Sequence, residues 1–218
     1  SGAVKDAVEF YSVLARNKEI RPHLLHEFEA VCTAGKDEAA PLLDLVFEEI
    51  TNVTLLLTVA DAAFDAKAPE KFERAFKRLI VALKGRKTEQ FFLGFGAAPE
   101  GPKPLLKKLV ESGRAAQARE LLLAYVDPMT AMTIQDDILL SQILTDDESK
   151  YLFLRRAGLT SALMQKLSLA PAATLEMAKK KMAASVPDEE DVALVAAFVE
   201  QVDLRKEIKF AEIAGLLE

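Results

Sequence analysis

LLKKLVESGRAAQARELLLAYV, residues 105–126, is the stretch that decides the fold class of this chain. Its apolar residues recur at spacings of three and four, the period of an amphipathic helix, on both sides of Ser112-Gly113. Glycine tolerates the left-handed conformation in which many helices end, so we expect Gly113 to have a positive φ. The stretch therefore predicts two short helices joined by a tight turn. Because such a helical hairpin cannot bury its apolar face alone, further helices are expected to stack on it.

The helical period continues through most of the chain, and no segment shows the sustained alternation that is typical of a strand. Tryptophan is absent and only 3 of the 218 residues are tyrosine, which disfavours a β-sheet protein. The clearest single helix begins at Pro69 and ends before Gly85. Gly35, Gly85 and Gly113 each have the place of a turn between two helices, but the intervals between them differ. We therefore predict an all-α protein of about 13 helices, arranged as an irregular α-solenoid of stacked helical hairpins.

One segment interrupts the helical pattern. GFGAAPEGPKP, residues 94–104, contains three glycines and three prolines, which are the strongest local breakers of helices. We expect an N-terminal helical half over residues 1–94, a linker over 95–104 and a C-terminal helical half over 105–218. One continuous domain is the alternative.

Composition and charge limit the classes of function. The net charge of −6 disfavours nucleic acid as the main partner, and the single cysteine, Cys32, excludes an internal disulfide. The longest apolar run, residues 53–60, is far shorter than the ~20 residues of a membrane-spanning helix. No targeting segment is visible, but the Ser1-Gly2 start is typical of a cloning scar, which leaves room for a targeting segment removed from before it. We therefore expect an intracellular protein, with the cytoplasm and an organelle matrix as the alternatives.

Three groups of residues are candidates for chemical sites. His23 and His26 lie three residues apart on one predicted helix and could hold a metal ion, but further ligands have no evident source. Gly94-Phe95-Gly96 lacks the preceding strand and third glycine of a nucleotide-binding loop. The acidic residues of the third group are better explained as helix caps than as acid–base catalysts or magnesium ligands; they are Asp136, Asp137, Asp146, Asp147 and Glu148.

The acidic group at residues 146–148 has a more specific signature. Thr145, with Glu148 three residues later, matches a capping box at the start of a helix.

Because none of these groups forms a convincing chemical site, the sequence predicts no catalytic residue, no metal and no cofactor, and the protein is expected not to be an enzyme.

A basic stretch supplies the candidate binding residues. They are Lys67, Lys71, Arg74, Lys77, Arg78, Lys84, Arg86 and Lys87. Helical spacing places Lys71, Arg74 and Arg78 on one stripe, opposite the apolar face of the same helix. This stripe is either a solvated face or a docking patch for an acidic protein, an RNA or a phosphoinositide head group. Residues 127–148 carry six acids and no base, which favours charge-steered assembly with a partner or with a second copy.

The hairpin at 105–126, and more loosely residues 36–126, resembles the tetratricopeptide, pentatricopeptide and HEAT-type helical-repeat proteins. The resemblance implies an α-solenoid that presents a concave surface to a peptide or, in the pentatricopeptide case, to single-stranded RNA. We therefore expect a non-enzymatic protein–protein interaction module, a scaffold or adaptor subunit whose partner has an acidic surface. A helical-repeat RNA-binding protein using the basic face at 67–87 is the alternative, and a homo-oligomer is also open.

Overall fold

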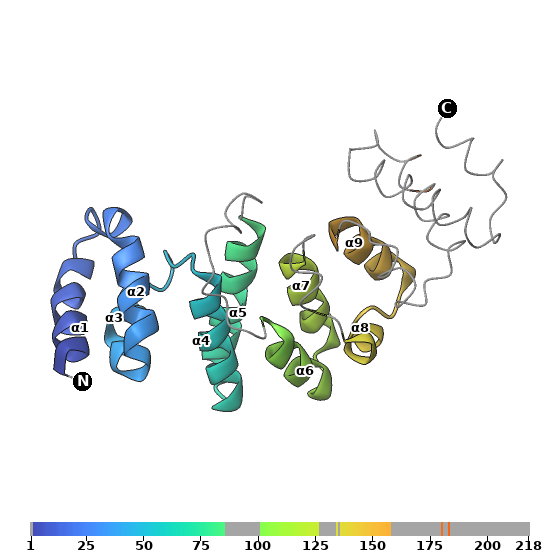
Figure 1. The fold of residues 1–218 in the computed structure, drawn as a ribbon, viewed down its shortest axis with the longest axis horizontal. Coiled ribbons are helices and arrows are strands. Elements are labelled where there is room, and N and C mark those ends of the chain that lie inside the picture. Colours follow the sequence, from blue (N-terminus) through green and yellow to red (C-terminus); the bar gives the residue numbers. More distant parts are fainter. Residues whose placement is uncertain are drawn as a thin grey trace. The chain divides into compact units, whose positions relative to one another are not determined.

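The computed structural model describes residues 2–85, 101–126 and 136–157, together with Ile134, Lys180 and Ala183. It divides into two compact units, Ser1–Pro99 and Glu100–Glu218, which are described separately below. The regular elements of the described residues are helices, with no strand among them (Figure 1). The all-α prediction is confirmed for this part of the chain. Residues 86–100 and, apart from Lys180 and Ala183, the chain beyond residue 157 lie outside the described residues, so the predicted number of helices is not tested there.

The described residues of the first unit form five α-helices. They are α1 (Gly2–Ala15), α2 (Leu25–Gly35), α3 (Ala40–Val46), α4 (Val53–Asp65) and α5 (Pro69–Lys84). Short 3-10 turns, η1 (Arg21–His23) and η2 (Lys36–Ala39), precede and follow α2. The helices α1, α2 and α3 pack on one another, whereas α4 and α5 lie side by side as a hairpin (Figure 1).

The sequence explains why α4 and α5 pair so closely. In α5 the apolar residues at helical spacing are all buried, namely Phe72, Phe76, Leu79, Ile80 and Leu83. Apolar residues nearly encircle α4, and its buried positions include Leu55, Leu56, Leu57 and Ala60. Such a helix needs neighbours on several sides. Here α4 contacts both α5 and α2.

The second unit contains the predicted hairpin as α6 (Lys103–Glu111) and α7 (Ala115–Tyr125). Gly113 has a φ of +77°, as expected. Its N–H donates to the Val110 carbonyl at 3.0 Å, and the Arg114 N–H donates to the Leu109 carbonyl at 2.8 Å. These two bonds form the Schellman motif that ends many helices. Two further helices, α8 (Asp137–Ile143) and α9 (Asp147–Ala157), pack on this hairpin.

The α4–α5 hairpin of the first unit closes in the same way. Three residues separate the two helices, and the middle one, Lys67, has a φ of +51°. The Lys67 N–H donates to the Phe64 carbonyl at 3.0 Å, and the Ala68 N–H donates to the Ala63 carbonyl at 3.1 Å. Lys67 therefore occupies the position that glycine occupies in the α6–α7 turn.

Gly35 and Gly85 stand at the ends of their helices, as predicted, but their backbone conformation differs from that of Gly113. Gly35 ends α2 and Gly85 follows α5, and both have a φ of −82°, which any residue can adopt. The equivalence in the structure is between Lys67 and Gly113 instead. Glycine positions in the sequence do not reveal this equivalence, because one of the two turns has a lysine at the position where the other has glycine.

Gly113→Ala should lower the free energy of unfolding by about 1–2 kcal/mol, because an L-residue is strained at positive φ. A Cβ at Gly113 would meet nothing within 4 Å, so backbone strain alone produces this loss. Gly85→Ala is the matched control, since it adds the same methyl group at an ordinary φ. Chemical denaturation of both variants checks the prediction, and equal stabilities would contradict the role of Gly113.

Candidate functional site

The described basic residues of the candidate site lie on and beside the exposed face of α5. Lys67 is in the turn before α5, whereas Lys71, Arg74, Lys77, Arg78 and Lys84 are on the helix itself. Arg86 and Lys87 lie outside the described residues. Among the described members, the two arginines differ from Lys67, Lys71 and Lys77 in what their side chains contact.

The two arginines contact the chain between α3 and α4. Arg78 donates from Nε to the carbonyl oxygen of Ile50, a fully buried residue, at 2.8 Å. Arg74 donates from Nε to Oε1 of Glu48 at 2.9 Å, and its guanidinium lies 4.4 Å from the centre of the Phe47 ring. Lys71 and Arg74 of the stripe are exposed, but Arg74 and Arg78 also contact a neighbouring segment.

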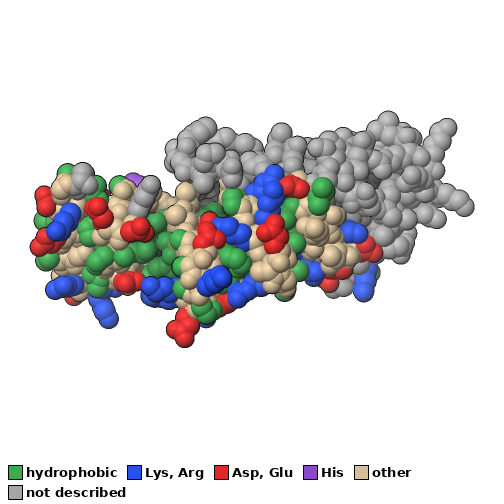
Figure 2. Space-filling view, turned by 90° about the horizontal axis from the view of Figure 1, so that it is seen from below, with side chains coloured by type: hydrophobic (Ala, Val, Ile, Leu, Met, Phe, Trp, Pro, Cys, Tyr) green, Lys and Arg blue, Asp and Glu red, His purple; other side chains and the backbone are tan. Residues whose placement is uncertain are grey.

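The lysines of the site behave differently. Lys67, Lys71 and Lys77 are exposed, and no hydrogen bond or ion pair joins their amines to another described residue. Figure 2 shows that Lys and Arg side chains on the viewed face are interspersed with Asp and Glu side chains and do not form one continuous basic field. We call Lys67, Lys71 and Lys77 the lysine surface.

The segment at 47–52, between α3 and α4, is held by side chains from three other elements, and we call it the connector. Besides its contacts with the two arginines of α5, it contacts Glu29 of α2. Oε1 of Glu29 accepts from the Thr51 N–H at 2.6 Å, from the Asn52 N–H at 2.9 Å and from the Thr51 hydroxyl at 3.2 Å. Asn52 in turn caps α4, because its Oδ1 accepts from the Leu55 N–H at 3.0 Å.

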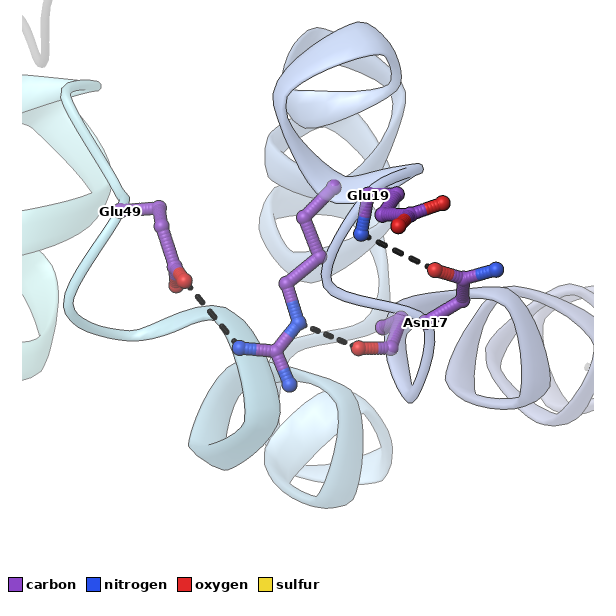
Figure 3. A network of polar contacts seen from close by, with 5 residues as sticks. Asn17, Glu19 and Glu49 are labelled. Carbon is purple, nitrogen blue, oxygen red and sulfur yellow. Dashed lines mark hydrogen bonds and ion pairs between the residues drawn. The ribbon is translucent and has the colours of Figure 1, made fainter.

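Besides Glu29 and the two arginines of α5, Arg21 of the η1 turn also contacts the connector. Its guanidinium donates to Glu49 at 3.1 Å and also to the carbonyl of Ala15, the last residue of α1 (Figure 3). The Arg21 side chain is 14% exposed and that of Glu49 is 40% exposed. The connector therefore joins α1, α2, α4 and α5 through polar contacts.

Sequence reasoning missed Glu29, which is 6% exposed. In the sequence it is one of several glutamates on an amphipathic helix, and its burial depends on residues that lie more than twenty positions later.

Glu29 also affects the pKa of Cys32, one turn further along α2. Burial, and secondarily the negative charge of Glu29, raise the pKa of the Cys32 thiol to about 12. At neutral pH this thiol is protonated and therefore a poor nucleophile.

Asp136 caps α8 in the second unit. Its Oδ1 accepts from the Leu139 N–H at 3.1 Å, and its Oδ2 lies 3.3 Å from the amine of Lys103 and 3.8 Å from that of Lys107. The Leu139 hydrogen bond, followed by the Lys103 contacts, holds the pKa of Asp136 below its ordinary value. A lowered carboxyl pKa stabilises the fold above the ordinary pKa, and that contribution is lost as the pH falls through the lowered value.

Asp146 caps α9 in the same manner. Its Oδ1 accepts from the Ser149 N–H at 2.8 Å, and its Oδ2 lies 2.9 Å from Arg119 of α7. The Ser149 hydrogen bond, followed by the charge of Arg119, lowers the pKa of Asp146. The capping interpretation of Asp136 and Asp146 is thus confirmed. The capping box was wrong, because Asp146 is the cap and the Thr145 hydroxyl accepts from Arg119 at 3.1 Å.

The histidine pair does not lie on one helix. His23 is in the η1 turn and His26 is in α2, and both are exposed. Among the described residues, no three His, Cys, Asp or Glu side chains are grouped as metal ligands. Gly94-Phe95-Gly96 lies outside those residues. No described helix has the length and apolar character to cross a membrane.

Four large apolar side chains of the described residues are exposed. Phe10 and Val13 lie three positions apart on α1 and are 60% and 62% exposed. Val81 is 51% exposed on α5, within one helical turn of Lys77 and Lys84, and Ile138 is 73% exposed on α8. The exposed face of α5 therefore combines amines with an apolar side chain.

Comparison with protein-family models, with curated proteins and with solved structures finds no match to this chain.

Arg78→Ala should lower the free energy of unfolding by about 1.5–3 kcal/mol, because the buried carbonyl of Ile50 loses a charged donor. Lys77→Ala is the matched control, since it removes a neighbouring cation that has no such contact, and it should change stability by less than about 0.5 kcal/mol. Urea denaturation of the two variants tests the difference. Equal losses would show that Arg78 does not hold the connector.

Proposed function

We propose that this chain is a non-enzymatic protein–protein interaction module, a scaffold or adaptor subunit of a larger complex. The observation that carries the proposal is the difference in contacts between the arginines and the lysines at α5. Its arginines bind the connector, whereas the amines of the lysine surface remain exposed without a partner among the described residues. Exposed lysines that do not stabilise the fold are available to attract an acidic partner.

An irregular α-solenoid is the architecture we propose for this module. Two hairpins, α4–α5 and α6–α7, have helices joined by three residues and the same pair of turn hydrogen bonds. In the second unit, α8 and α9 pack on the hairpin, as neighbouring elements of a helical stack would. The chain would then present side chains of α5 from a rigid helical scaffold.

A protein is a better partner for this face than an RNA. Binding of single-stranded RNA usually adds aromatic side chains on which bases stack, whereas the large exposed apolar residue of α5 is Val81.

The module would work inside the cell, where a free thiol such as that of Cys32 remains reduced.

Lys71→Glu/Lys77→Glu should slow association with the native partner roughly tenfold at low salt, because the steering charge is reversed. Lys5→Glu/Lys18→Glu is the matched control, since it changes the net charge equally at exposed positions away from α5. The partner is first captured with the wild-type protein and identified, and its association is then measured by interferometry at low and high salt.

Equal association rates for both double variants would contradict the proposal. Co-purification of RNA that is lost in Lys71→Glu/Lys77→Glu but kept in the control would assign the face to RNA instead. Thermal melting of both variants should match that of the wild type, because exposed lysines contribute little to stability.

A further inference from the structure

Lys67 stands in a backbone conformation that disfavours lysine. Its φ of +51° is the only positive value among the described residues that are not glycine. In the equivalent turn of the α6–α7 hairpin the same position is Gly113, with a φ of +77° and the same two hydrogen bonds around it. The fold therefore accepts glycine at this position, and lysine introduces strain that glycine would avoid.

No contact of the side chain offsets this strain. Lys67 is exposed, and no hydrogen bond or ion pair joins its amine to another described residue. Strained residues that the fold itself does not require occur mainly at functional positions. Lys71, also exposed and without such a contact, lies four positions further along at the start of α5.

We propose that Lys67 is the anchor of the lysine surface and that, with Lys71, it binds carboxylate side chains of an acidic segment in the partner protein. This inference rests on the proposed function and specifies its ligand. A lysine amine is a compact charge with three donors on a flexible stem, so it can accept single carboxylates that approach from different directions. The large exposed apolar side chain of α5 is Val81, which is not an aromatic ring on which RNA bases could stack.

The proposal gives stability and binding opposite signs for one substitution. Lys67→Gly should raise the melting temperature by about 2 °C, because glycine relieves the strain. The same variant should bind a fluorescein-labelled decaglutamate peptide about fivefold more weakly, as measured by fluorescence anisotropy at low salt. Lys67→Arg keeps the charge and should leave both values close to those of the wild type.

Lys5→Gln serves as the control for the loss of one exposed lysine elsewhere, and it should not change peptide binding. If Lys71→Gln weakens binding but Lys67→Gly does not, the anchor role of Lys67 is overturned while the proposed function stands. If the wild-type protein does not bind the peptide, both proposals fail.

Two further results would overturn the inference. A lower melting temperature for Lys67→Gly, with unchanged peptide binding, would mean that the amine stabilises the C-terminal end of α4 and serves the fold. Tighter binding of a labelled oligouridylate than of decaglutamate, lost in Lys67→Gly, would assign the residue to RNA.

Discussion

The buried carboxylate of Glu29 fixes the start of α4, and the arrangement of the first unit depends on it. The first N–H groups of a helix lack partners within the helix, and those just before it need partners as well. Glu29 accepts from the N–H groups of Thr51 and Asn52, and this also satisfies its own buried charge. Since α5 is joined to α4 as a hairpin, the same contact positions the face of α5 that carries the lysine surface.

Carboxylates at helix starts also organise the second unit. Asp136 and Asp146 each cap one helix and at the same time contact the α6–α7 hairpin. Asp136 contacts Lys103 and Lys107 of α6, and Asp146 contacts Arg119 of α7. A cap by itself contributes on the order of 1 kcal/mol. When the capping residue also binds a neighbouring helix, it fixes where one helix begins relative to another. Polar contacts of this kind specify how helices pack where leucine and alanine packing alone allows several arrangements.

The sequence predicted the features that depend on neighbouring residues, and it missed those that depend on residues far apart in the chain. The helices at Pro69–Lys84 and 105–126 were predicted well because their apolar spacing and end signals are local. The turn at Lys67 was missed because its left-handed conformation is imposed by the α4–α5 packing on a residue that gives no turn signal. The basic stripe was predicted as a set, but the roles of Arg74 and Arg78 depend on the distant connector. Glu29 was missed for the same reason.

Amide hydrogen exchange at Thr51 and Asn52 tests most directly whether Glu29 fixes the start of α4. Both amides should exchange slowly in the wild-type protein. In Glu29→Ala they should lose their protection, with a fall in the free energy of unfolding of about 2–4 kcal/mol, because two N–H groups lose their acceptor. Glu29→Gln retains a carbonyl oxygen and should keep part of the protection. Full protection of both amides in Glu29→Ala would contradict this account.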